Sequence, residues 1–148
     1  MSSGIWDNLN LVIHLLAKMQ RTNPFANLAR KGRMNNDCLF CKISAGFIPS
    51  EKVYESDTLF AFNDINPQAP THILIVPRAH HATLLDVEET NHEVMGSIIS
   101  VANQLAKERG LDKSGYRLVV NCGEGAGQSV FHIHFHLLGG RPLQWPPG

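Results

Sequence analysis

Apolar residues and histidines alternate along Phe131-His132-Ile133-His134-Phe135-His136-Leu137-Leu138. Side chains of a β-strand point alternately to the two faces of a sheet. The pattern therefore predicts a strand with His132, His134 and His136 on one face and apolar residues on the other. A solvated strand face has no need of three imidazoles, because Thr, Lys or Glu serve there equally well. The row indicates a functional site.

Two kinds of chemistry use such a row, and the preceding loop helps to choose between them. Three neutral imidazoles and a water make an open catalytic zinc site. Alternatively, one imidazole attacks phosphorus while its neighbours donate hydrogen bonds to phosphoryl oxygens. Residues 121–129 carry three glycines at alternate positions and end on Ser129. Backbone N–H groups of such a loop can line an anion site, although a plain hairpin connection is the simpler interpretation. Beside the histidines, we favour a phosphate site.

Composition indicates a globular domain with an extension. The chain has 148 residues, 43% of them hydrophobic, and zero formal net charge. No apolar run reaches the ~18 residues of a bilayer span, and the balanced charge argues against broad capture of polyanions, so we expect neither membrane nor nucleic-acid partners. Residues 1–36 hold five basic residues and one acidic residue, a net +4, whereas residues 37–148 hold eight basic and 12 acidic residues, a net −4. We place the domain at 37–148.

Two interpretations of the basic extension, residues 1–36, stay open. Its apolar residues fall on one side of a helix, at Ile5, Leu9, Val12, Leu16 and Met19. An amphipathic, Arg-containing and acid-poor segment suits a mitochondrial presequence, but a helix that docks on a protein has the same pattern. Three cysteines do not form a disulfide scaffold and suit a reducing compartment. We expect a cytoplasmic or nuclear location, or a mitochondrial one if residues 1–36 act as a presequence.

The sequence pattern within residues 37–148 predicts an α+β architecture. A long helix is expected after Asp86, where Asp86 and Glu89 resemble a capping box and Gly110 suits a helix stop. The other expected elements are a short helix over residues 38–45, a meander of strands at 53–54, 59–62 and 73–76, and two further strands over 116–121 and 131–138.

Four stretches together resemble the histidine triad (HIT) superfamily, and within it the Hint branch of purine nucleoside phosphoramidases. They are residues 37–43, 61–72, 128–138, with its His-φ-His-φ-His-φ-φ signature, and 139–148. The resemblance covers residues 37–148. It implies the HIT-like fold, an antiparallel five-stranded sheet with one long and one short helix, continued across a homodimer.

The resemblance also implies an activity. His134 would attack the α-phosphorus of an adenosine 5′-phosphoramidate or acyl-adenylate, expel the leaving group, and leave a nucleotidyl-histidine that water hydrolyses to AMP. A neutral imidazole is a suitable nucleophile at pH 7. The implied catalytic residues are His134, His136, His132, His72 and Ser129.

The implied nucleotide contacts include Asp64 for the ribose hydroxyls and a group of apolar residues for the purine. From the residues alone, Asp64 is also an ordinary turn residue, and the apolar positions are equally suited to a core. Trp145 belongs to the tail segment that, by resemblance, reaches the partner subunit's active-site edge. The full set is Phe40, Ile43, Phe62, Asp64, Ile65, Asn121, Gly127, Gln128, Ser129, Val130, His134, His136 and Trp145.

Cys38-x-x-Cys41 has two interpretations from spacing alone, a redox pair or half of a zinc site. The chain resembles a zinc-containing subgroup of histidine triad proteins, in which the remaining ligands match His80 and His132. Two thiolates and two imidazoles make a closed, structural zinc site. We expect zinc there and no organic cofactor.

Three other functions are compatible with these residues. A nucleotide-binding adaptor on the same fold would bind AMP without needing His134 for turnover. A hydrolase with catalytic zinc on His132, His134 and His136 would lose all activity with chelator. A dinucleoside polyphosphate hydrolase is the nearest rival, but the ending Trp145-Pro146-Pro147 favours the Hint branch.

Overall fold

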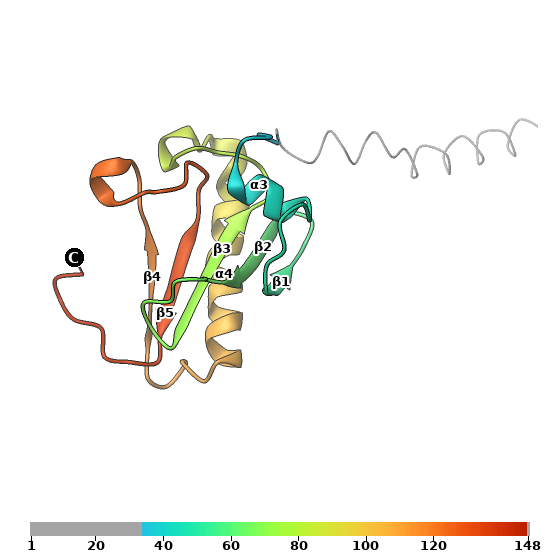
Figure 1. Ribbon diagram of the computed structural model, residues 1–148. Helices are drawn as coiled ribbons and strands as arrows, with labels where there is room; N and C mark the ends of the chain where they lie inside the picture. The colour runs from blue at the N-terminus through green and yellow to red at the C-terminus, as the bar shows by residue number, and fades with distance from the viewer. Residues whose placement is uncertain (1–33, 148) are drawn as a thin grey trace, which may run out of the picture. The chain divides into compact units, whose positions relative to one another are not determined.

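The computed structural model describes residues 34–147, and the amphipathic helix predicted within residues 1–33 lies outside this range. Among the described residues no helix is long and apolar enough to cross a membrane. The helices are α3 (Leu39–Ser44) and α4 (His92–Glu108). The strands, shown in Figure 1, are β1 (Lys52–Glu55), β2 (Leu59–Asn63), β3 (Thr71–Pro77), β4 (Tyr116–Val120) and β5 (Phe135–Gly139). Single 3-10 turns occupy Leu84–Asp86, Glu89–Asn91 and Glu124–Ala126.

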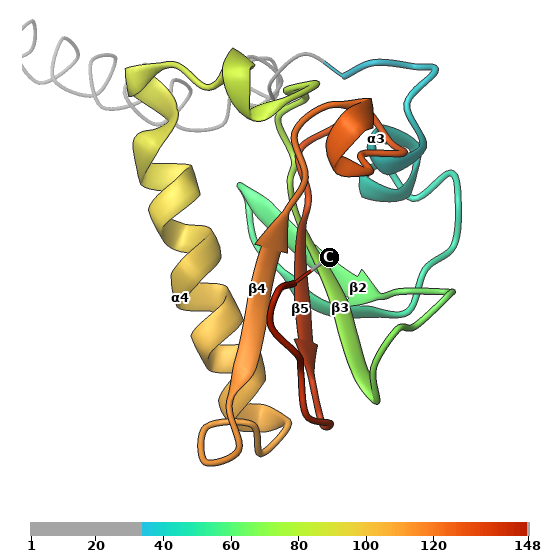
Figure 2. The same ribbon diagram turned by 90° about the vertical axis from the view of Figure 1, so that its left-hand side faces the viewer.

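The strands form one five-stranded sheet in the order β1-β2-β3-β5-β4, and every neighbouring pair is antiparallel. The long helix α4 and the short helix α3 lie on opposite faces of this sheet (Figures 1 and 2). The predicted α+β class, with a five-stranded antiparallel sheet and one long and one short helix, is confirmed.

Alternation along β2 and β3 explains why both faces are covered. Leu59, Ala61, Ile73 and Ile75 pack against α4, together with Leu137 of β5. The residues between them, such as Phe60, Phe62, Leu74 and Val76, pack against α3. Each fully buried large apolar side chain contributes about 1.5–3 kcal/mol of transfer free energy. The central strands are therefore held from both sides, and they form a firm base for side chains that project beneath α3.

The histidine segment was predicted as a strand over 131–138, and this prediction is wrong at its start. β5 begins only at Phe135, where pairing with Ile75 of β3 and Val120 of β4 also begins. Backbone bonds turn the earlier residues away from the sheet, since the N–H of Ile133 donates to the carbonyl oxygen of His81. The alternation itself holds from β5 onward, because Phe135 and Leu137 pack in the cluster beneath α4 while His136 pairs with Leu74 on the α3 face.

The long helix also begins later than predicted. Two 3-10 turns precede α4, and their capping boxes run from Thr83 to Asp86 and from Glu88 to Asn91. Asp86 thus closes the first box instead of opening the helix. The predicted stop is confirmed, because Gly110 follows the C-cap residue with φ +68°.

Candidate functional site

Three imidazoles of the histidine segment meet where β3 ends and β5 begins. His132 and His134 are buried, with 0% and 5% of their surface exposed. The ring of Phe40, from α3, stands edge-on against His134 with ring centroids 5.0 Å apart. The rings of His134 and His136 are also 5.0 Å apart. The short helix therefore forms one wall of a site lined by imidazoles.

His134 is held in one tautomer by the backbone of its own segment. Its Nδ1 lies 2.7 Å from the carbonyl oxygen of His132. A carbonyl can only accept, so Nδ1–H donates and the lone pair of the neutral ring is on Nε2. Burial lowers the pKa of His134, an effect only partly opposed by this hydrogen bond and by Asp64. At neutral pH, His134 presents an unprotonated Nε2.

His136 is fixed in the opposite tautomer by a relay through His72. The backbone N–H of Gln68 donates to Nδ1 of His72 over 3.1 Å. The neutral His72 ring then carries its proton on Nε2 and donates it to Nδ1 of His136, 2.8 Å away. His136 consequently carries its own proton on Nε2. Burial, and then the neighbouring histidines, lower the pKa of His136 to about 4. The Gln68 donor could not be predicted from the sequence, because any residue except proline supplies that N–H.

Asp64 stands beside this relay at the turn after β2. One carboxylate oxygen accepts from the backbone N–H of Asn66 over 2.8 Å. The other lies 3.3 Å from Nε2 of His72. The structure thus brings together Asp64, His72 and His136, all three predicted as site residues, within 4.8 Å of one another.

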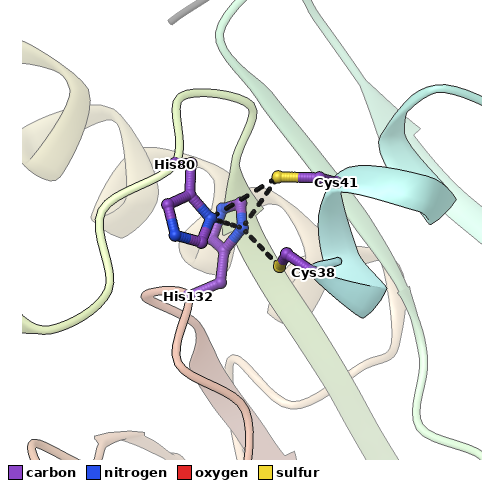
Figure 3. Close-up of side chains that lie close together, drawn as sticks. All are labelled: Cys38, Cys41, His80 and His132. Carbon is purple, nitrogen blue, oxygen red and sulfur yellow. Dashed lines mark hydrogen bonds between the residues drawn. The ribbon is translucent and has the colours of Figure 1, made fainter. Parts of the chain in front are cut away.

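A second cluster joins α3 to the loop after β3 and to the histidine segment (Figure 3). Its four donor atoms belong to Cys38, Cys41, His80 and His132 and lie within 4.8 Å of one another. Nδ1 of His132 is 3.4 Å from the sulfur of Cys38 and 3.6 Å from that of Cys41. Nδ1 of His80 is 3.3 Å from Nδ1 of His132 and 3.5 Å from the sulfur of Cys41.

These separations fit a tetrahedral cation. Bond lengths of about 2.3 Å to sulfur and 2.0–2.1 Å to nitrogen place tetrahedral ligands about 3.3 Å apart for two nitrogens and about 3.6 Å apart for sulfur and nitrogen. The protonation of His132 also fits, because its Nε2–H donates to the carbonyl oxygen of Pro77 over 2.8 Å and leaves Nδ1 free. A backbone acceptor of this kind orients ligating histidines.

Burial sets the charge state of the cluster. It lowers the pKa of His132 to about 4, so the ring is neutral, as a ligand must be. Burial raises the pKa of the Cys41 thiol. A raised pKa favours the neutral thiol, so a thiolate at this position requires a positive charge nearby. These four residues could hold a cation that supplies this charge.

The Gly-rich loop is shaped by Gln128, whose side chain is directed inward. Its Oε1 accepts from the N–H of Gly123 over 2.8 Å, and its Nε2 donates to the carbonyl oxygens of Ala82 (2.7 Å) and Val130 (3.0 Å). Both amide hydrogens are used within the protein, so the side chain shapes the loop more directly than it offers a donor to a ligand. Gly127, with φ +85°, closes the 3-10 turn of this loop in the left-handed region.

The other predicted contacts fall into two groups. Phe40, Ile43 and Phe62 are buried together in the cluster beneath α3. Ile65 is fully exposed, and Trp145 is 85% exposed. Along the loop before β5, Ser129 is exposed while Asn121 and Val130 are half-buried. The structure joins the first three residues to His134 through Phe40, and it leaves Ile65 and Trp145 without an apolar cluster around them.

Comparison with known proteins gives concordant matches. A family model described as "HIT domain" matches residues 45–143. The chain is 51% identical over 112 residues to the "14 kDa zinc-binding protein" of Zea mays, covering 74% of this chain and 87% of that protein. It is 47% identical over 110 residues to the purine nucleoside phosphoramidase of Escherichia coli (strain K12), covering 74% and 92%. A solved HIT family hydrolase from Legionella pneumophila Philadelphia 1 matches with a TM-score of 0.75 and 53% identity, covering 76% of this chain and 100% of that one.

Proposed function

Because this chain belongs to the HIT family of hydrolases, we propose that it cleaves adenosine 5′-phosphoramidates, including acyl-adenylate-type substrates, to AMP. The observation that carries the proposal is the pair of opposite tautomers in one site. His134 offers a lone pair on Nε2, whereas His136 offers a proton on Nε2. A nucleophile beside a hydrogen-bond donor is what attack on an anionic phosphorus centre needs.

The first step uses the lone pair of His134. Nε2 attacks the α-phosphorus, a nitrogen–phosphorus bond forms to the ring, and the bond to the leaving amine breaks. The amine takes up one proton, for which the exposed Ser129 hydroxyl is the proposed donor, resupplied by solvent. The ring becomes a cationic nucleotidyl-imidazolium, and its Nδ1–H stays bonded to the His132 carbonyl oxygen. That acceptor stabilises the positive charge as it develops.

The second step returns the ring to neutrality. Water attacks the same phosphorus, the bond to Nε2 breaks, and AMP leaves while one proton passes to solvent. The Nε2–H of His136 donates to a phosphoryl oxygen in both steps, and the chain from Gln68 through His72 holds it there. Asp64 accepts from the ribose hydroxyls with the oxygen that faces the site. Phe40, Ile43 and Phe62, with Ile65, hold the purine.

A structural zinc ion is part of the proposal. The relative from Zea mays is named a zinc-binding protein, and the sulfur–nitrogen and nitrogen–nitrogen separations of 3.3–3.6 Å within the cluster are those of tetrahedral ligands. When bound, zinc supplies a positive charge that holds Cys38 and Cys41 as thiolates beside His80 and His132. Since the backbone of His132 also orients His134, the metal cluster and the nucleophile share one residue. We further propose a homodimer in which Trp145 borders the partner's site.

The decisive experiment measures AMP release from adenosine 5′-phosphoramidate by wild type, His134→Ala and His92→Ala. His92 is an exposed histidine at the start of α4 and serves as the matched control. We expect a loss of roughly 10³-fold or more for His134→Ala and no change for the control. Quenching in alkaline denaturant, which preserves a phosphorus–nitrogen bond, should trap a covalent nucleotidyl adduct in wild type and in His92→Ala but not in His134→Ala.

Three outcomes would replace this proposal. Equal rates for wild type and His134→Ala would remove the nucleophile. AMP binding without turnover by any variant would favour an adaptor. The same assay with a dinucleoside triphosphate tests the neighbouring alternative, since faster cleavage of that substrate would move the function to dinucleoside polyphosphate hydrolysis.

A further inference from the structure

The chain after β5 turns closely against the turn between β2 and β3. Gly140 has φ +87°, in the left-handed region that favours glycine. A Cβ at this position would lie 2.9 Å from Cβ of Pro70, whose ring cannot rotate away. Only glycine therefore lets the two segments approach this closely, and the approach brings the next residue, Arg141, over the turn.

The guanidinium of Arg141 binds that turn through one backbone carbonyl group. Its Nε and Nη2 both donate to the carbonyl oxygen of Gln68, over 3.1 and 3.0 Å. The remaining arm, Nη1, donates to the carbonyl oxygen of Pro142 over 3.0 Å. Two charged donors on one acceptor make a stronger and more directional contact than a single neutral hydrogen bond. The position of Gln68 is thus set by the segment that leaves β5.

Gln68 is the residue whose N–H selects the tautomer of His72. Its N–H lies 3.1 Å from Nδ1 of His72, and Nε2 of His72 lies 2.8 Å from Nδ1 of His136. The turn is also anchored at Asn66, whose N–H donates to Asp64, and at Pro70, which packs on Gly140. Among the hydrogen bonds of the described residues, however, only those from Arg141 hold the carbonyl oxygen of Gln68. Without the guanidinium, the Gln68 N–H is free to move away, and His72 can then carry its proton on either nitrogen.

We propose that Arg141 is a positioning residue that fixes, through Gln68, which nitrogen of His72 and of His136 carries the proton. The proposal deepens the proposed function, because it assigns to Arg141 the placement of the phosphate-binding Nε2–H. The residue itself touches neither His72 nor His136. Its effect should therefore appear in the imidazole protons and in turnover, with little change in substrate affinity.

The test compares two arginines that both hold the C-terminal segment. Arg141→Met removes the contact with Gln68, whereas Arg117→Met removes only a contact between Nη2 of Arg117 and the carbonyl oxygen of Gln144. Nitrogen-15 NMR of the histidine rings reports which nitrogen is protonated. We expect Arg141→Met to convert His72 from one tautomer to a mixture and to lower kcat about tenfold with KM nearly unchanged. Arg141→Lys should restore part of the wild-type His72 tautomer and part of the wild-type kcat.

A control variant and a second variant show which results would contradict the role proposed for Arg141. Arg117→Met should keep the wild-type ring spectrum and rate, and Gly140→Ala should reproduce the Arg141→Met spectrum with the guanidinium retained. If the ring spectrum of Arg141→Met equals that of Arg117→Met, the positioning role is wrong. If wild type does not cleave the phosphoramidate, the proposed function fails, and the NMR comparison still decides the role of Arg141.

Discussion

Two groups of histidines, each with acidic or thiol partners, lie on the α3 side of the sheet, and their hydrogen-bond directions differ. In the group of Asp64, His72 and His136, each close nitrogen contact has a donor and an acceptor, beginning at the Gln68 N–H. In the group of Cys38, Cys41, His80 and His132, the lone pair on Nδ1 of His132 faces two sulfurs and another Nδ1. In the first group the protons of the rings and of the backbone complete the hydrogen bonds. In the second group the lone pairs converge as the ligands of a cation do. Proximity of ligand-type residues alone would not separate them.

The largest expected effect tests the cation site. Cys38→Ser combined with Cys41→Ser should lower bound zinc from about one ion per chain to nearly none. The melting temperature should fall by roughly 10–20 °C, as a loss of about 4 kcal/mol would cause in a domain of this size. Elemental analysis and thermal unfolding measure the two effects. The control is Cys122→Ser, because Cys122 lies outside the cluster. Full zinc content in the double variant would exclude this ligand set.

The next effect separates catalysis from metal binding. His136→Asn removes the Nε2–H that is proposed to contact phosphate, so kcat should fall by about 100-fold or more. Zinc content and melting temperature should stay close to those of wild type, because His136 belongs to the group of Asp64, His72 and His136, which we call the proton-linked group, and not to the cation site. His132→Asn should show the reverse order of effects, with zinc lost first. If His136→Asn also loses zinc, the two groups are not independent.

A smaller effect concerns the proposed ribose acceptor. Asp64→Asn keeps an oxygen for the N–H of Asn66 but removes the charge that faces His72. We expect KM for adenosine 5′-phosphoramidate to rise about tenfold, with a smaller change in kcat, because a charged acceptor for two hydroxyls is weakened. Asp57→Asn, at an exposed position before β2, is the control. An unchanged KM would show that Asp64 serves the turn alone.

Local patterns were sufficient to predict the strands of the sheet, apart from the start of β5. The membership of the two groups of site residues was expected from the resemblance to the histidine triad superfamily, because the patterns alone single out only the histidine row and the Cys38-x-x-Cys41 pair. The alternation in residues 131–138 has a period of two, and the packing follows it, because Phe135 and Leu137 contact the cluster beneath α4 while His134 contacts Phe40 of α3. The start of β5 was not predictable, because it depends on a backbone bond from Ile133 to His81, which is distant in sequence. The start of α4 was missed because capping residues are frequent before it and two boxes compete.

The tautomers of the site histidines could not be predicted from the sequence for a related reason. The groups that fix them are the N–H of Gln68 and the carbonyl oxygens of His132 and Pro77. Backbone groups are the same at nearly every position, so no residue type marks them. The inward direction of the Gln128 side chain was equally hidden, since an amide suits a ligand and a loop clamp alike.

The smallest expected effect is a pH dependence of stability that originates in the proton-linked group. Burial lowers the pKa of His136 to about 4, whereas an unfolded histidine titrates near 6.5. Between these values the unfolded chain binds a proton that the folded protein does not, so stability falls as pH decreases through this window and stops responding to His136 below about pH 4. His136→Gln should therefore lose less melting temperature than wild type between pH 6.5 and 4. Acid also releases metal from the other group, so both proteins are compared in the Cys38→Ser, Cys41→Ser background. Equal slopes there would mean that folding does not lower the pKa of His136, which would contradict its burial beside His72 and His134.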